Sequence, residues 1–178
     1  KPLNGKSWVT AVLPFIEQQS LYDQYNHNVL AVNEAGPIGK ANVALISMPL
    51  NVFICPSAPG GANRIYDGNA APALPVTWRA APSDYIACTG VRGLFGDLAY
   101  NNNQGGNRDG ALQVFGPYGG NNSGRLEDII DGTTNTFLIG ERTGGKQIYI
   151  RRTPDSALTA ALSIANGGGW GDVLNGEN

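Results

Sequence analysis

The stretch Ile129-Ile-Asp-Gly-Thr-Thr-Asn-Thr-Phe-Leu-Ile-Gly-Glu141 carries the strongest structural signals in the chain. Its Asp131-Gly132 pair is typical of a turn, because an Asp side chain accepts backbone N–H groups and Gly tolerates positive φ. The apolar residues that follow predict a short strand over residues 136–139. We expect this strand to form a β-hairpin with residues 147–151, around Gly144-Gly145.

Helical segments are predicted on both sides of this hairpin. Residues 126–130 are expected to form one helical turn, capped by Ser123. Residues 153–165 are expected to form a short helix that Pro154 and Asp155 begin.

The N-terminal part of the chain predicts a longer helix. Apolar residues recur at helical spacing over residues 7–25. Pro14 lacks an N–H and crowds the preceding turn, so we expect a kink or a break there. A loop with Gly36, Pro37 and Gly39 is predicted over residues 28–40, followed by a short helix over residues 41–48 that ends before Pro49.

The middle of the chain predicts short strands and long loops. Strands are expected at residues 52–55, 84–88 and 111–115. Residues 57–83 are rich in Gly, Ala, Pro and Asn and are predicted to be a long loop, with Asp67-Gly68 as a turn. We therefore expect one α+β domain over residues 1–178, in which the N-terminal helix packs on a small, mostly antiparallel sheet with long loops.

Composition limits the partners of the protein. Of 178 residues, 42% are hydrophobic and only 15% are charged, so many uncharged polar residues must face water. This balance is common in extracytoplasmic β-rich proteins. The net charge is −2, and Arg151-Arg152 is the only adjacent basic pair. Nucleic acid is therefore not expected as a partner, because phosphate binding needs clustered Lys and Arg.

The two cysteines, Cys55 and Cys88, do not have the spacing of a metal site. We expect a disulfide between them, because both lie at the ends of predicted strands and the composition is that of an exported protein. Such a bond would close a loop of about 33 residues and stabilise the fold by about 3–4 kcal/mol. The alternative is two buried, unrelated thiols.

Three segments of the chain, in this order, resemble a family signature: residues 7–18 (SWVTAVLPFIEQ), residues 53–57 (FICPS) and residues 129–141. They look like the large planctomycete family of pilin-like, type II secretion pseudopilin-like surface proteins of unknown function. Further support comes from Ser83-Asp84-Tyr85, from Gly90, from residues 110–115, and from Gly168-Gly169-Trp170 with Asp172. The resemblance covers nearly the whole chain.

The resemblance implies a structural subunit rather than an enzyme. Members typically begin with a prepilin-type leader and a long hydrophobic helix, neither of which precedes Lys1 in this sequence. The chain is then expected to be the extracytoplasmic head of a longer, membrane-anchored protein at the cell surface or in the periplasm. Its expected partners are other pilin-like subunits or secretion-system proteins. The resemblance implies no catalytic residues and no cofactor.

A calcium site is the one metal hypothesis. Calcium binds several carboxylate, amide and carbonyl oxygens, and related pseudopilins bind calcium in a loop. Asp128 and Asp131 are the main candidates, with Asp97, Asp109 and Asp172 as further ones. The structural alternative is that Asp131 only stabilises its turn, and the absence of an Asp-x-Asp-x-Asp loop favours this.

Two other functions remain as alternatives. Trp78 and Trp170 lie among loop residues, where exposed rings would stack on sugars in a carbohydrate- or ligand-binding module. The alternative is that each tryptophan pins a loop to the domain. A glycoside hydrolase would need two facing carboxylates, for which Glu17, Glu127 and Glu141 are candidates. His27, the single histidine, is expected to be a surface residue near a helix end rather than part of a triad.

Overall fold

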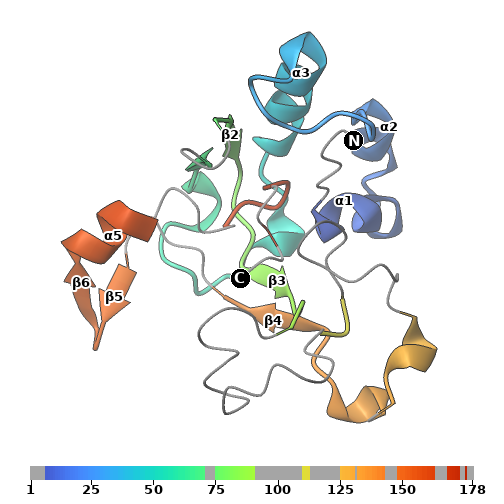
Figure 1. Cartoon of the computed structure of the whole chain (residues 1–178), viewed down its shortest axis with the longest axis vertical. Helices are drawn as coiled ribbons and strands as arrows, with labels where there is room; N and C mark the ends of the chain where they lie inside the picture. Colours follow the sequence, from blue (N-terminus) through green and yellow to red (C-terminus); the bar gives the residue numbers. More distant parts are fainter. Residues whose placement is uncertain are drawn as a thin grey trace.

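The computed structural model in Figure 1 describes residues 7–70, 75–90, 110–112, 125–130, 132–142, 148–162, 168–172 and 175. Their fold is α+β, as the sequence predicts, with helices in the N-terminal half and short antiparallel strand pairs after them. The predicted strand at 111–115 falls mostly outside the described residues, and so does the predicted cap residue Ser123.

The predicted break in the N-terminal helix is confirmed at Pro14. α1 (Trp8–Val12) runs into a turn of 3-10 helix, η1 (Leu13–Ile16), and α2 (Gln19–Gln24) follows. Pro14 lies at the start of η1, where its missing N–H costs no hydrogen bond. Glu17 then takes a left-handed backbone with φ 62°, which turns the chain into α2.

The next helix begins earlier than predicted. α3 (Gly36–Ile46) includes Pro37 in its first turn, so the loop expected up to residue 40 ends at residue 35. Gly39 is needed for packing, because a Cβ there would lie 2.5 Å from the carbonyl oxygen of Val32. Within the described chain, no helix has the length and apolar character needed to cross a membrane.

The strands form antiparallel pairs. β1 (Tyr66–Asn69) pairs with β2 (Thr77–Ala80), and β3 (Tyr85–Ala87) pairs with β4 (Ile139–Glu141). The last pair is β5 (Ile148–Ile150) with β6 (Thr153–Asp155). The predicted hairpin between residues 136–139 and 147–151 is therefore wrong, since β4 pairs with the distant β3 and β5 pairs with the segment after it.

Two further predictions fail in the middle of the chain. Residues 57–83 are not one long loop, because they contain β1 and β2, and Asp67-Gly68 lies within β1 rather than in a turn. The Trp78 ring explains this glycine: a Cβ at Gly68 would lie 2.5 Å from the indole Nε1. The strand expected at residues 52–55 is instead a 3-10 turn, η2 (Asn51–Phe53), with an extended residue after it.

Short helical turns and one helix complete the described elements. They are η3 (Gly61–Asn63), η4 (Leu126–Asp128), η5 (Thr133–Asn135) and α5 (Ser156–Leu162). η4 confirms the single helical turn predicted at 126–130, and the residue before it is Arg125. α5 confirms only the middle of the helix predicted at 153–165, because its expected first residues form β6.

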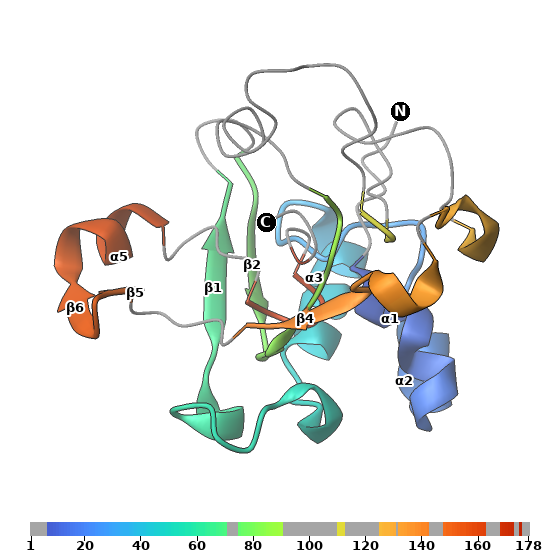
Figure 2. The same ribbon diagram turned by 90° about the horizontal axis from the view of Figure 1, so that it is seen from below.

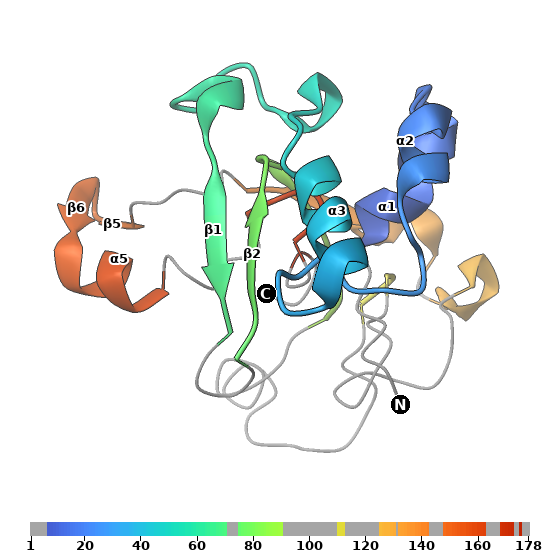
Figure 3. The same ribbon diagram turned by 90° about the horizontal axis from the view of Figure 1, so that it is seen from above.

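The core lies between the helices and the β1–β2 pair. Figure 3 shows α3 beside β2, with α1 and α2 beyond α3. Residues 168–172, drawn in red, cross the middle of the molecule (Figure 1). The largest apolar side chains that are at most 2% exposed at this centre are those of Val9, Leu13, Ile46, Trp78 and Trp170. The C-terminal residues are thus part of the core that the N-terminal helices form.

Candidate functional site

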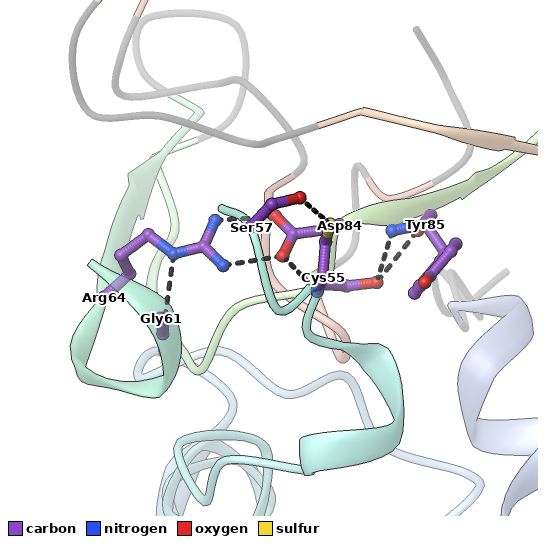
Figure 4. Close-up of polar contacts among 7 residues, drawn as sticks. Cys55, Ser57, Gly61, Arg64, Asp84 and Tyr85 are labelled. Atoms are coloured by element: carbon purple, nitrogen blue, oxygen red, sulfur yellow. Dashed lines mark hydrogen bonds and ion pairs between the residues drawn. The ribbon is translucent and has the colours of Figure 1, made fainter. Parts of the chain in front are cut away.

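The most concentrated charge in the described chain surrounds Asp84, which lies just before β3 and is completely buried (Figure 4). Its backbone N–H donates to the carbonyl of Phe53 at 2.8 Å, and its carbonyl accepts from the N–H of Arg142 at 2.7 Å. Its Oδ2 accepts a further hydrogen bond from the N–H of Cys55 at 2.8 Å. Asp84 thus joins the segments before η3 and after β4 to the start of β3.

Arg64 neutralises this buried carboxylate. Its Nη1 and Nη2 donate to the two Asp84 oxygens at 2.6 and 2.7 Å, and its Nε donates to the carbonyl of Gly61 at 2.9 Å. The hydrogen bonds to Asp84 raise the pKa of Arg64. A paired and buried guanidinium and carboxylate form a strong, geometrically specific contact. Asp84 engaged in this way holds together the chain segments that bond to it.

Three more residues are connected to this pair. Tyr66 acts on Arg64 and Asp84 electrostatically, and Asp172 acts on Arg142, whose N–H donates to Asp84. Tyr66 on β1 is 3% exposed, and its hydroxyl makes no hydrogen bond of good geometry. Burial raises the pKa of Tyr66, while the nearby positive charges of Arg64 and Arg142 act in the opposite direction. Burial lowers the pKa of Arg142, against the charges of Tyr66 and Asp172. We call Arg64, Tyr66, Asp84, Arg142 and Asp172 the Asp84 cluster.

The expected disulfide is not formed. Cys55 and Cys88 are both free, and the Cys55 Sγ contacts the Ser57 Oγ at 3.1 Å. The backbone N–H of Cys55 donates a hydrogen bond to the side chain of Asp84, just before β3. Cys88 lies four residues after Asp84 and its N–H donates to the carbonyl of Leu138, so the two cysteines lie at the two ends of β3. Of the alternative of two buried thiols, the structure matches the Cys55 part, because Cys55 is buried whereas Cys88 is half-buried.

The ligand-stacking hypothesis for Trp78 and Trp170 is also wrong. The two side chains are 2% and 0% exposed, so neither ring presents a face to a sugar. Trp170 donates from Nε1 to the carbonyl of Met48 at 2.8 Å and from its backbone N–H to Ala81 at 2.9 Å. Both rings pack in the core, and the missing Cβ of Gly68 leaves space for the Trp78 ring.

The calcium candidates are not brought together in the described residues. Asp128 is exposed, and its Oδ2 accepts the N–H of Arg125 at 2.8 Å, which stabilises η4. Asp172 is buried in the C-terminal segment. Asp131, Asp97 and Asp109 lie outside the described residues. Within the described chain, no three His, Cys, Asp or Glu side chains are grouped to hold a metal ion.

The other candidate residues lie on different elements. His27 is half-buried, its Nε2 lies 3.0 Å from the carbonyl of Tyr22, and its ring packs on Tyr22 and Tyr25. Glu17, Glu127 and Glu141 are all exposed, and Glu127 pairs with Arg125 at 2.8 Å.

No pattern in the sequence indicated that the residues of the Asp84 cluster lie together. Ser83-Asp84-Tyr85 and Asp172 contributed separately to the resemblance, and Asp172 was also a calcium candidate. Arg64, Tyr66 and Arg142 were not singled out. One signal was present: Arg64 is one of only three charged residues between positions 57 and 83. In a segment so poor in charge, a lone arginine needs an acidic partner if it is buried.

The described residues define an α+β domain in which the main group of buried charges joins distant parts of the chain. The chain belongs to the SBP_bac_10 family, proteins of unknown function (DUF1559), which it matches over residues 1–177. Comparison with curated proteins and with solved structures gives no match.

Proposed function

We propose that the chain is the extracytoplasmic head of a pilin- or pseudopilin-like structural subunit, which acts in surface assembly or secretion and not as an enzyme. The resemblance places a hydrophobic assembly helix before α1 in such a subunit. A head of this kind must be held firmly to that helix, so that its position in an assembly follows the position of the helix.

The observation that supports this proposal is the attachment of α1. Ser7 caps α1 and donates from Oγ to the carbonyl of Trp170 at 2.6 Å. The Trp8 Nε1 donates to the Asn175 Oδ1 at 2.9 Å, and the Trp8 ring packs edge-on against Phe53 at 5.9 Å between ring centres. The first turn of α1 is thus bonded to residues more than 160 positions away.

The residues of the resemblance supply both sides of this attachment. Ser7 and Trp8 belong to its first segment, Phe53 to its second, and Trp170 to its C-terminal support. Val9 and Leu13, also in the first segment, are fully buried. These residues therefore form a rigid joint between a helix and a head, which is a mechanical role and requires no reacting group.

The partners in this proposal are other pilin-like subunits or secretion-system proteins, which the protein contacts through the preceding helix. The location is the cell surface or the periplasm, with the membrane reached only through that helix. No cofactor is required, and calcium at Asp128 and Asp131 stays a hypothesis. The net charge of −2 and the lack of a basic stripe argue against nucleic acid.

The experiment is intact-mass and N-terminal analysis of the mature protein recovered from its native cells. The proposal expects a long hydrophobic helix ahead of Ser7 that begins with an N-methylated residue. A mature N-terminus close to Lys1 would overturn it, because a free domain has no helix through which to assemble.

A further inference from the structure

β5, β6 and α5 form a small arm, residues 148–162, that extends from the β1 side of the molecule, away from the N-terminal helices (Figures 1 and 2). The arm is held by its own hydrogen bonds. The N–H of Ile148 donates to Thr159 Oγ1 at 2.8 Å, and the N–H of Leu158 donates to Asp155 Oδ1 at 2.8 Å. Hydrogen bonds within the arm therefore define its structure.

The tip of the arm is the turn Arg151-Arg152, between paired Ile150 and Thr153. Both arginines have a left-handed backbone, with φ 49° and 69°. A two-residue hairpin turn of this kind favours Asn-Gly, and strain held at such a position often accompanies a functional contact. Both arginines are exposed, and exposed Tyr149 and Ile150 flank them. The tip thus presents two positive charges beside apolar surface.

Residues 125–130 form a second exposed surface, which combines negative charge with apolar side chains. Leu126 is 75% exposed and Ile130 is 91% exposed, with the exposed carboxylates of Glu127 and Asp128 between them. Arg125 pairs with Glu127, but both side chains are about 70% exposed, so an incoming guanidinium competes with a weak pair. We call residues 125–130 the acidic face.

The tip and the acidic face lie at opposite ends of the molecule. In Figures 1, 2 and 3 the arm is on the left, whereas the acidic face, drawn in gold, is on the right. The two surfaces of one chain do not meet in the described structure, although their charges and apolar residues are complementary. Two copies can therefore bind each other, because each copy carries one basic tip and one acidic face, and opposite charges attract across an interface.

We propose that the arm tip of one copy docks on the acidic face of a second copy. Arg151 and Arg152 pair with Glu127 and Asp128, and Tyr149 and Ile150 cover Leu126 and Ile130. This contact is heterologous, so it leaves a free tip and a free face at the two ends and extends into a row of copies. The inference rests on the proposed function, for which it names the contact between heads.

Two charge-reversed proteins test the contact. R151E/R152E makes the tip acidic, and E127K makes the face basic, while Asp128 is kept because it stabilises η4. Neither protein should associate with itself, since each carries two surfaces of like charge. An equimolar mixture should associate, because each surface of one protein then complements a surface of the other. K40E and D23K, at exposed positions on α3 and α2, serve as charge controls.

Sedimentation of the 178-residue protein measures association from about 10 µM to about 1 mM, the range of weak interfaces. We expect the average mass of the wild type to rise with concentration, and each reversed protein to associate at least about tenfold more weakly. The mixture should recover wild-type association, and the control substitutions should leave it unchanged. Association should also weaken at about 1 M salt, where the Debye length is about 3 Å.

A wild type that stays monomeric would overturn the contact, and so would a mixture that fails to recover association. Loss in the tip variant without recovery in the mixture would mean that the tip docks on a surface of the second copy other than the acidic face, which overturns the proposed contact. Far-UV circular dichroism and thermal unfolding confirm that each variant is folded. The mature N-terminus tests the proposed function separately. If the mixture recovers association but no helix precedes the domain, the contact between copies stands and the pilin role is removed. If a helix precedes the domain but the mixture does not recover association, the pilin role stands and the contact is removed.

Discussion

Asp84 bonds to three separate segments of the chain, at residues 53–55, at Arg64 and at Arg142. Asp84→Asn keeps the size of the side chain and removes the negative charge that Asp84 places against Arg64, whose side chain is 11% exposed. We expect the free energy of unfolding to fall by about 3–5 kcal/mol, the range for breaking a buried ion pair. Urea or guanidinium unfolding measures this loss.

The matched control is Asp67→Asn. Arg79 and Asp67 pair at the same 2.6 Å distance, but their side chains are 60% and 54% exposed. An exposed pair contributes about 0–1 kcal/mol, so this change should have little effect. Equal losses in the two variants would show that burial does not decide the contribution of the Asp84 pair.

Ionisation of the Tyr25 side chain should make the free energy of unfolding fall at alkaline pH. It is 4% exposed, and burial raises its pKa from 10.0 to about 12. Between these values the unfolded phenol has lost its proton and the folded one has kept it, so the folded state binds more protons. Stability from this group is complete below pH 10 and falls as pH rises through about 12, by about 2–3 kcal/mol in all.

The measurement is the free energy of unfolding of the wild type and of Tyr25→Phe over this pH range. The substitution keeps the ring and removes the ionising group, so the other tyrosines and the lysines titrate equally in both proteins. The advantage of the wild type over the variant should shrink as pH rises. A constant difference would mean that Tyr25 ionises alike in the folded and unfolded states.

At the scale of elements, local signals were sufficient where the structure depends on local chemistry. The break at Pro14 follows from a missing N–H and a ring clash, so it holds in any surroundings. The strand at residues 84–88 was found from its aromatic and β-branched residues, and β3 confirms its centre. The helical turn at residues 126–130 was predicted with Ser123 as its cap, and η4 confirms the turn itself over Leu126–Asp128.

The start of α3 and the strand β1 were not predicted, because each contains a glycine that makes room for a residue elsewhere in the sequence. Gly39 and Gly68 were interpreted as loop and turn signals, yet Gly39 lies within α3 and Gly68 lies within β1. Each is there because another group occupies the space of its Cβ: the Val32 carbonyl in one case and the Trp78 ring in the other. A pattern of neighbouring residues cannot distinguish a glycine that bends the chain from one that admits a ring.

The pairing of the strands could also not be predicted from the pattern of neighbouring residues. The order of the sequence favours pairing residues 136–139 with the next strand, but β4 pairs with β3, more than 50 positions earlier. The Asp84 cluster has the same character, since its members lie between positions 64 and 172. Their residue types were visible in the sequence, and their meeting is a property of the tertiary fold.

At the scale of the whole molecule, the C-terminal segment closes the structure. The N–H of Ser83 donates to the carbonyl of Gly168, Trp170 donates to Ala81, and Ala81 donates to Ile46, all at 2.8–2.9 Å. These bonds connect residues 168–170 to α3 and to the turn before Asp84. The attachment of α1 to Trp170 adds the N-terminal helices to the same unit. The arm, by contrast, is held mainly by bonds within itself.

Hydrogen exchange should therefore divide the chain into two parts. The amides of Ala81, Ser83 and Trp170 should exchange only when the whole core unfolds, whereas the amide of Ile148 in the arm should exchange through local opening at a lower free energy. Asp84→Asn should speed exchange of the three core amides together and leave Ile148 unchanged, because the Asp84 cluster lies outside the arm. Mass-spectrometric or NMR exchange measures both effects. If Ile148 were as protected as the core, or were affected equally by Asp84→Asn, the arm would be part of the same cooperative unit and not a separate projection.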